Sequence, residues 1–315
     1  MVKKISWFIK PLVIFGVILL SILFVYKNLG EIQQIRIVNP IYLLPIMILT
    51  IVFLITNGLI SKIILDKQGV RLRFTEWFGL SVVGSMANYI TPFRGGLFTN
   101  AVYLKKSHAY SYGKFISIIG STYVLIFMVN SLCGLLALLW FYYSSGVFSA
   151  LLFLVFLFLF IFCLFLLIIP LKLQKTHSNS YIQKVLNVIN NLLYLRKNKR
   201  LIIKLLCLCL INVSIVSLIN YFEFMMIGVE LGIEKSIMLS VFSTYSLLLS
   251  ITPGSLGIKE SFMVYSGWVL SVPIASVAVI SVVDRLITFV PTLLLGLFYS
   301  HKLMRHDTNR DVVKN

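Results

Sequence analysis

Six ionisable side chains lie within stretches of sequence that are otherwise strongly apolar, and they are the residues that could do chemistry. They are Arg94, Glu223, Lys259, Glu260, Asp284 and Arg285. A charged side chain at the centre of a lipid-exposed helix costs about 2.5–3.5 kcal/mol on insertion scales. We therefore expect these side chains to pair with one another or to hold a polar ligand.

Two of the acidic residues have plausible basic partners. Asp284 and Arg285 are neighbours, so on a helix they point about 100° apart and cannot share one partner equally. We expect Arg285 to pair with Glu260, and Asp284 with Lys259. These pairs either hold the fold together or belong to a binding site.

Arg94 has no acidic residue near it in the sequence, and two glycines follow it. A guanidinium group matches phosphate oxygens in a bidentate geometry. Arg94 therefore indicates a site for an anionic ligand, with Lys259 as the second candidate cation, and helix N-termini beside it would add positive dipole. The predicted substrate-binding residues are Arg94, Gly95, Gly96, Lys259, Glu260 and Arg285.

One apolar segment, 201–227, also carries a row of polar residues. Ser214, Ser217, Asn220 and Glu223 recur every three residues, and we expect them to form one stripe that faces the interior. Glu223 lies near the end of the segment, so it either joins this stripe or reaches toward the headgroups. Asp284, Asn220 and Glu223 are predicted to support the binding site.

Composition places these residues in a polytopic all-α membrane protein. The 315 residues are 59% hydrophobic and 12% charged, with a mean hydropathy of +0.97. The net charge of +18 comes from residues between apolar segments, so membrane topology explains it better than nucleic-acid binding does. The four cysteines lie in apolar runs, and neither a metal site nor a cofactor is indicated.

Hydropathy predicts six full spans and two interrupted regions, about eight hydrophobic segments in all. The spans are 8–26, 40–64, 114–142, 147–169, 201–227 and 273–300. The segment 147–169 is almost free of polar residues and should face lipid. Residues 170–200 have apolar residues at helical spacing flanked by basic ones, which predicts an amphipathic helix on the cytoplasmic surface.

The interrupted regions, 76–106 and 236–270, resemble each other. Both contain Ile-Thr-Pro, and a glycine follows four residues after each proline, at Gly96 and Gly257. Proline breaks a helix, and the freed backbone groups cannot face lipid. Each region is either a re-entrant helical hairpin or two short full spans. The predicted hinge residues are Thr91, Pro92, Thr252, Pro253, Gly254 and Gly257.

The distribution of basic residues favours hairpins that return to the side they enter, with both chain termini in the cytoplasm. The first hairpin would then enter from the cytoplasm and the second from outside. The chain is predicted to be a single domain, 1–315, with inverted halves at about 40–142 and 201–300. Inverted repeats with interrupted helices are typical of transporters, whose sites lie at the repeat interface.

The segments "TPGSLGIKE" and "DRLITFVPTLLLGL" resemble the flippase-like transmembrane domain of lysylphosphatidylglycerol synthases and related stand-alone membrane proteins. That family typically shows Pro-Gly-x-x-Gly-x-x-Glu and then an arginine in the final span, here Pro253, Gly254, Gly257, Glu260 and Arg285. "TPFRGGLFTNAVYLKK" is similar to its first-half motif. Ser255 and Thr99-Asn100 depart from the usual pattern, which weakens any transfer of substrate.

The resemblance implies lipid handling without aminoacyl transfer, because only about 15 residues follow the last predicted span. We expect a translocase, a flippase or scramblase, for an anionic lipid or lipid-linked glycan precursor in the cytoplasmic (inner) membrane. The alternative is a non-transporting subunit that binds a lipid or polysaccharide biosynthesis enzyme. A lipid-modifying transferase is less favoured, because no catalytic motif is found.

Overall fold

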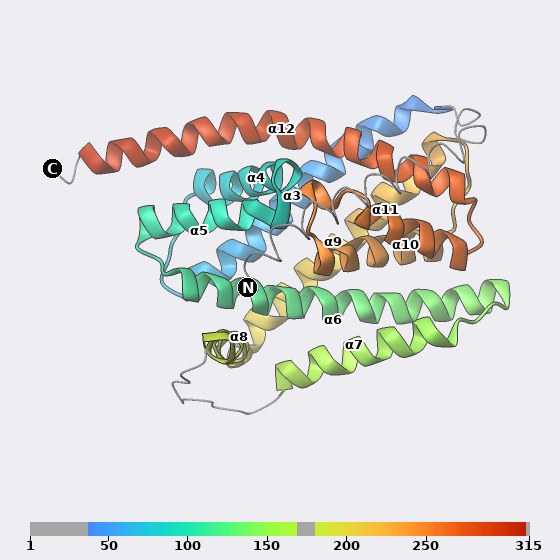
Figure 1. The fold of residues 1–315 in the computed structure, drawn as a ribbon, viewed down its shortest axis with the longest axis horizontal. Coiled ribbons are helices and arrows are strands. Elements are labelled where there is room, and N and C mark those ends of the chain that lie inside the picture. Colours follow the sequence, from blue (N-terminus) through green and yellow to red (C-terminus); the bar gives the residue numbers. More distant parts are fainter. Residues whose placement is uncertain (1–36, 169–179, 313–315) are drawn as a thin grey trace, which may run out of the picture.

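The computed structural model describes residues 37–168 and 180–312, and this part of the chain is helical and contains no strand (Figure 1). The predicted span 8–26 lies outside the described residues. The elements are η1 (Pro40–Tyr42), α3 (Leu43–Lys67), α4 (Phe74–Ile90), η2 (Pro92–Arg94), α5 (Gly95–His108), α6 (Tyr112–Ser145), α7 (Ala150–Ile168), α8 (Ser180–Arg196), α9 (Lys199–Met226), α10 (Ile233–Tyr245), η3 (Ser246–Leu249), η4 (Pro253–Ser255), α11 (Ile258–Val269) and α12 (Ile274–Val312).

Five helices in the described part are long and apolar enough to cross a membrane, which makes this a multi-pass membrane protein. They coincide with the five predicted spans that fall within the described residues. Their bounds are Pro40–Lys67, Tyr112–Ser145, Ala150–Ile168, Lys199–Met226 and Ile274–Met304. As predicted, α7 is largely exposed, and it packs along α6.

Both interrupted regions break at the predicted Thr-Pro pairs. Pro92 and Pro253 each begin a short 3-10 turn, η2 and η4. The chain then takes left-handed backbone angles, with φ of 54° at Arg94, 56° at Gly254 and 78° at Gly257. Glycine adopts positive φ angles without steric cost. A residue with a side chain, such as Arg94, does so rarely.

Each pair of helices around a break returns to the end of the bundle from which it came. In Figure 1, α4 and α5 extend from one end to the centre, and α10 and α11 extend from the opposite end to the centre. Of the two alternatives left by the sequence, this geometry corresponds to a re-entrant hairpin. We call α4–η2–α5 the first hairpin and α10–η3–η4–α11 the second hairpin.

The hairpins pack reciprocally. The first hairpin packs on α12 through α4, and the second packs on α6 through α10, while α3 packs on α9. The helices α3 and α9 run antiparallel: the Val38 N–H donates to the Met226 carbonyl at 2.9 Å, and near the other end the Tyr194 hydroxyl donates to the Lys67 carbonyl at 2.7 Å. This packing fits the predicted inverted halves, which stay a prediction.

The tips of the two hairpins meet at the centre of the bundle. The Phe93 N–H donates to the Ile251 carbonyl at 3.3 Å, which joins the two breaks directly. Tyr89, at the end of α4, shares a hydrogen bond of 2.9 Å with the Thr288 hydroxyl of α12. Backbone groups freed by the breaks thus find partners inside the protein, as an apolar environment demands.

The base of the first hairpin is held by a polar cluster around Glu76 in the first turn of α4. Its carboxylate accepts hydrogen bonds from the Arg73 N–H at 2.9 Å and from Tyr103 at 3.1 Å, and it contacts His108 at 3.0 Å. Burial alone would raise the pKa of Glu76, but the bonds from His108, Arg73 and Tyr103 outweigh it and lower the pKa to about 2. The cluster therefore ties the two arms of the hairpin together.

The segment predicted to be an amphipathic helix forms α8, and part of its apolar face packs against the bundle. Leu186, Leu192 and Leu195 are buried, and the helix packs on α6. Asn191 is buried as well, where it accepts from the Gln68 amide at 2.7 Å and donates to Ser121 at 2.8 Å. The helix α8 is thus anchored to the bundle, in addition to any contact with lipid.

The first hairpin depends on the absence of a side chain at Gly96. A Cβ there would lie 1.8 Å from the Gly84 carbonyl oxygen of the facing helix, and the Gly96 N–H donates to Asn88 at 3.0 Å. We predict that Gly96→Ala separates α4 from α5 and destabilises the protein by about 1–3 kcal/mol, the usual cost of overpacking. Thermal unfolding in detergent, followed by size-exclusion chromatography, measures this loss.

The matched control is Gly113→Ala. Gly113 lies at the start of α6, and a Cβ there would meet no atom within 4 Å. The control should unfold at or slightly above the wild-type temperature, because alanine is favoured over glycine in a helix. Equal stability of the two alanine variants would contradict this account of Gly96.

Candidate functional site

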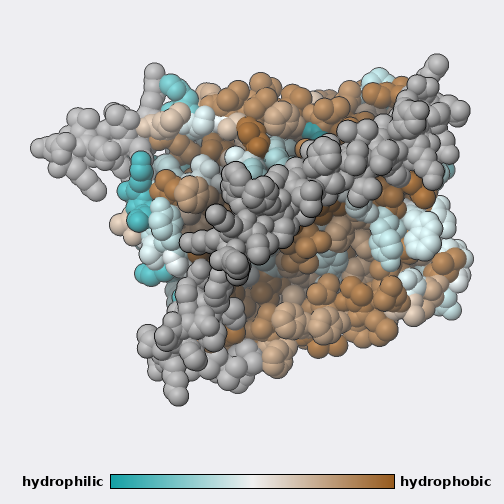
Figure 2. Space-filling model, in the orientation of Figure 1, coloured by the Kyte–Doolittle hydropathy of each residue, from teal (hydrophilic) through white to brown (hydrophobic). Residues whose placement is uncertain are grey.

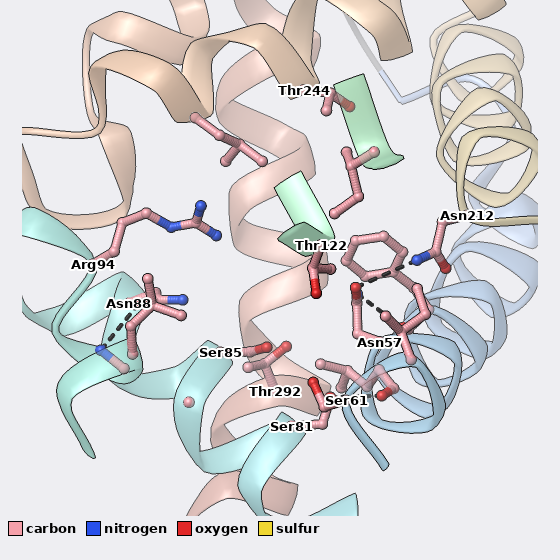
Figure 3. Close-up of a pocket in the computed structure, with 18 of the residues that line it drawn as sticks. Asn57, Ser61, Ser81, Ser85, Asn88, Arg94, Thr122, Asn212, Thr244 and Thr292 are labelled. Carbon is pink, nitrogen blue, oxygen red and sulfur yellow. Dashed lines mark hydrogen bonds between the residues drawn. The ribbon is translucent and has the colours of Figure 1, made fainter. Parts of the chain in front are cut away.

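A cavity of about 400 Å³ lies where the hairpin tips meet the long helices. Polar side chains from α3, α4, α6, α9, α10 and α12 point into it (Figure 3). They include Asn57, Ser61, Ser81, Ser85, Asn88, Thr122, Asn212, Thr244 and Thr292. Polar side chains that gather in a cavity inside an apolar bundle can bind a polar ligand.

The cavity extends from the hairpin tips along the first hairpin. Its lining reaches Leu65, Leu72, Leu104 and Phe115 at the base of the first hairpin. Hydrophilic residues gather at this end of the molecule in Figure 2, where α5 ends in Figure 1. The last turn of α5 carries Lys105 and Lys106. Clusters of buried apolar side chains pack around both hairpins. The lining of the cavity extends further along the first hairpin than along the second.

Arg94 points into the cavity from η2 (Figure 3). Its guanidinium donates a hydrogen bond to the Tyr123 hydroxyl of α6 and lies 5.1 Å from the centroid of that ring. No acidic side chain of the described residues forms an ion pair with it. The positive charge of Arg94 is thus available to an anion in the cavity.

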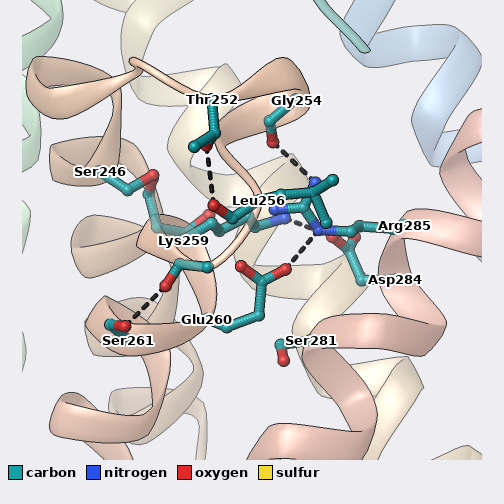
Figure 4. Close-up of polar contacts among 12 residues, drawn as sticks. Ser246, Thr252, Gly254, Leu256, Lys259, Glu260, Ser261, Ser281, Asp284 and Arg285 are labelled. Atoms are coloured by element: carbon teal, nitrogen blue, oxygen red, sulfur yellow. Dashed lines mark hydrogen bonds and ion pairs between the residues drawn. The ribbon is translucent and has the colours of Figure 1, made fainter. Parts of the chain in front are cut away.

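Two ion pairs join the second hairpin to α12 (Figure 4). Lys259 pairs with Asp284, and Arg285 pairs with Glu260, as the sequence predicted. Arg285 also donates through Nη1 to the Gly254 carbonyl oxygen at 2.7 Å. This contact satisfies a backbone group freed by the break, so Arg285 holds η4 and the start of α11 in place.

The pairing leaves the lining residue Lys259 neutralised in this structure. Lys259, Asp284 and Arg285 all line the cavity, so its wall carries two cations balanced by acids and a third, Arg94, without one. The helices α5 and α11 both begin at the breaks, with Gly95 and Ile258 as their first residues. Their N-termini add positive potential near the cavity.

The predicted polar stripe on α9 is partly wrong. Ser217, Asn220 and Glu223 are buried, but Ser214 is exposed and bonds only to the Leu210 carbonyl. A three-residue step turns a helix by about 300°, so three such steps place Ser214 and Glu223 on opposite sides. Glu223 is fully buried, and so it does not extend toward the headgroups.

The glycines predicted to bind substrate have packing roles in the structure. A Cβ on Gly95 would lie 2.2 Å from Oγ1 of Thr91, and one on Gly96 would collide with α4. Gly96 also lines the cavity, and its role in substrate binding stays a prediction. The prediction omitted Asn57, Asn212 and Tyr123, although amides inside apolar spans are a signal that could have found the first two.

No cluster of three potential metal ligands occurs among the described residues, and the four cysteines are unpaired. The fold and cavity together define a class: multi-pass helical membrane proteins with two opposed interrupted hairpins around a polar site. The sequence matches the family described as the lysylphosphatidylglycerol synthase TM region over residues 7–296, so the chain belongs to this family. No curated relative matches the sequence.

The Glu260–Arg285 pair gives a direct stability prediction. Arg285→Ala removes the partner of a largely buried carboxylate and of the Gly254 carbonyl, and it should destabilise the protein by about 3–5 kcal/mol. The double variant Glu260→Gln/Arg285→Gln should lose less, because it leaves no unpaired charge. Thermal unfolding in detergent compares the two.

The control for this comparison is Lys62→Ala, which breaks a more exposed ion pair with Asp66 on α3. Exposed pairs of this kind contribute only about 0.2–1 kcal/mol. If Arg285→Ala were no more harmful than Lys62→Ala, Arg285 would not be holding the second hairpin.

Proposed function

We propose that this protein is a translocase, a flippase or scramblase, for an anionic lipid or a lipid-linked glycan precursor. The observation that carries the proposal is the position of Arg94, which presents a positive charge to a polar cavity between two opposed hairpins. A guanidinium suits a phosphate headgroup, because it can donate two parallel hydrogen bonds. The family match supports a membrane role and leaves the transported lipid to be identified.

The arrangement supports a headgroup inside the protein and acyl chains outside it. Polar side chains and Arg94 line part of the cavity, whereas Phe98 and Leu248 near the hairpin tips are exposed apolar side chains that can contact lipid tails. A headgroup bound at Arg94 would therefore stay attached to chains in the bilayer.

The extension of the cavity lining along the first hairpin suggests a direction of access. We propose that the structure represents the state open toward the basic end, which the distribution of lysine and arginine places in the cytoplasm of the cell membrane. Relative motion of the two halves would then open the opposite side, as in other proteins with inverted repeats. Both chain termini are placed in the cytoplasm by the same reasoning.

Arg94 can be tested by lipid translocation in vesicles that contain the purified protein. The probes are labelled phosphatidylglycerol, which is anionic, and labelled phosphatidylcholine, which has no net charge. We predict headgroup-selective movement by the wild type and a loss of about tenfold or more in Arg94→Ala, because a hydrogen bond to a charged group contributes about 1.5–3 kcal/mol. Arg94→Lys should keep part of the rate.

The control variant is Lys114→Ala, which removes an exposed cation at the start of α6 and should leave the rate unchanged. Movement of both probes at equal rates by all variants would argue against the site at Arg94. If the purified protein moved no lipid, a non-transporting subunit that binds a lipid or glycan biosynthesis enzyme would be favoured. Chemical change of the headgroup would instead indicate a transferase.

A further inference from the structure

Glu223 is buried in a way that the proposed function does not explain. Its side chain is 0% exposed, and neither carboxylate oxygen has a hydrogen-bond donor among the described residues. One turn earlier on α9, Nδ2 of the buried Asn220 also lacks an acceptor in this part of the chain. An ionised carboxylate in such a place is costly unless something neutralises it.

The group that faces Glu223 is the carboxyl of Asp284 on α12, close enough for a hydrogen bond, with Lys259 of α11 as the nearest cation. Two ionised carboxylates offer only acceptors to each other. One proton between them would give each a partner and would remove the repulsion of like charges. The pair would then carry a single negative charge, which Lys259 balances.

The other ionisable groups around this cluster have partners elsewhere, although Nη2 of Arg285 has no acceptor among the described residues. Arg285 is bound to Glu260, and the Tyr89 hydroxyl of α4 is bound to Thr288. Neither supplies a donor to Glu223. Asp284 and Lys259 line the cavity, whereas Glu223 lies behind them, away from its lining. The carboxyl pair thus connects the cavity wall to a buried acid.

We propose that Glu223 and Asp284 share one proton and that the pair takes up a second proton when an anionic headgroup draws Lys259 away from Asp284. This inference rests on the proposed function, because it assigns a coupled proton and the cation Lys259 to the same anion site. Under this proposal, binding of the anion favours binding of the proton, and binding of the proton favours binding of the anion.

The exchange balances in charge. At rest, the O–H group of one carboxyl donates to the other, and Lys259 neutralises the pair. When the ammonium group moves to a headgroup phosphate, the pair keeps one uncompensated negative charge. A proton from water then forms an O–H bond on the remaining carboxylate, so both acids are neutral. Release of the anion reverses these steps, and the proton returns to water.

The first test detects the resting proton without any transport. Infrared spectroscopy of the purified protein should show the C=O stretch of a buried protonated carboxyl group at neutral pH, with a shift in heavy water. Glu223→Gln should remove this band, because a shared proton requires both carboxyl groups. Glu230→Gln, which changes an exposed carboxylate, should keep it. Absence of the band from the wild type would overturn the inference.

The second test measures how the affinity for the anion depends on pH. The probe is a short-chain phosphatidylglycerol, whose phosphodiester does not titrate near neutral pH, and a water-soluble glycerophosphodiester distinguishes a lipid from its free headgroup. Uptake of one proton per anion predicts that affinity rises about tenfold for each unit by which pH falls. In Glu223→Gln/Asp284→Asn the affinity should be independent of pH, because Lys259 is no longer held.

The outcomes separate the two proposals. A pH-independent affinity in the wild type would overturn the coupling and leave a translocase that needs no proton. Failure of both probes to bind, with the infrared band present, would count against the proposed function and against its coupling, while the shared proton itself would stand. The wild-type measurements require no substitution, so they decide the matter even if the double variant does not fold.

Discussion

The structure depends on the requirement that backbone groups inside an apolar bundle find partners within the protein. Helices satisfy this requirement automatically, and a broken helix does not. Arg285 meets it for the second hairpin, because one guanidinium binds both the Gly254 carbonyl and the Glu260 carboxylate. The first hairpin is secured differently, through the Phe93–Ile251 bond between the tips and the Asn88–Gly96 bond within the hairpin.

Breaking two helices at the centre of the bundle has an electrostatic consequence. Each break creates a helix N-terminus and concentrates polar side chains at one level. The acids of α12 and α11 neutralise Arg285 and Lys259, while Arg94 on the other hairpin donates a hydrogen bond to a tyrosine and forms no ion pair among the described residues. The two breaks are therefore alike in backbone geometry and unlike in charge. This asymmetry is what turns a packing arrangement into a site for an anion.

Reciprocal packing explains how the hairpins can be both interrupted and stable. Each hairpin packs on a long helix of the opposite half, α4 on α12 and α10 on α6, and the halves are clasped through α3 and α9. The cavity remains where the tips meet, on the side of the first hairpin. The lining of the cavity extends further along the first hairpin than along the second, so the two hairpins contribute unequally to it.

The sequence by itself determined the class of protein, the five long helices within the described residues, the positions of the breaks and the two ion pairs. These follow from local causes: hydropathy sets the spans, Thr-Pro stops a helix, and charges within apolar segments must pair. Only the tertiary structure decided what depends on helix rotation and on contacts between distant segments. Ser214 turned away from the stripe that holds Glu223, Gly96 proved to be needed for the approach of two helices, and the amides of Asn57 and Asn212 were brought to one cavity. Periodicity along one helix cannot fix those features, because they depend on which neighbour each helix face meets.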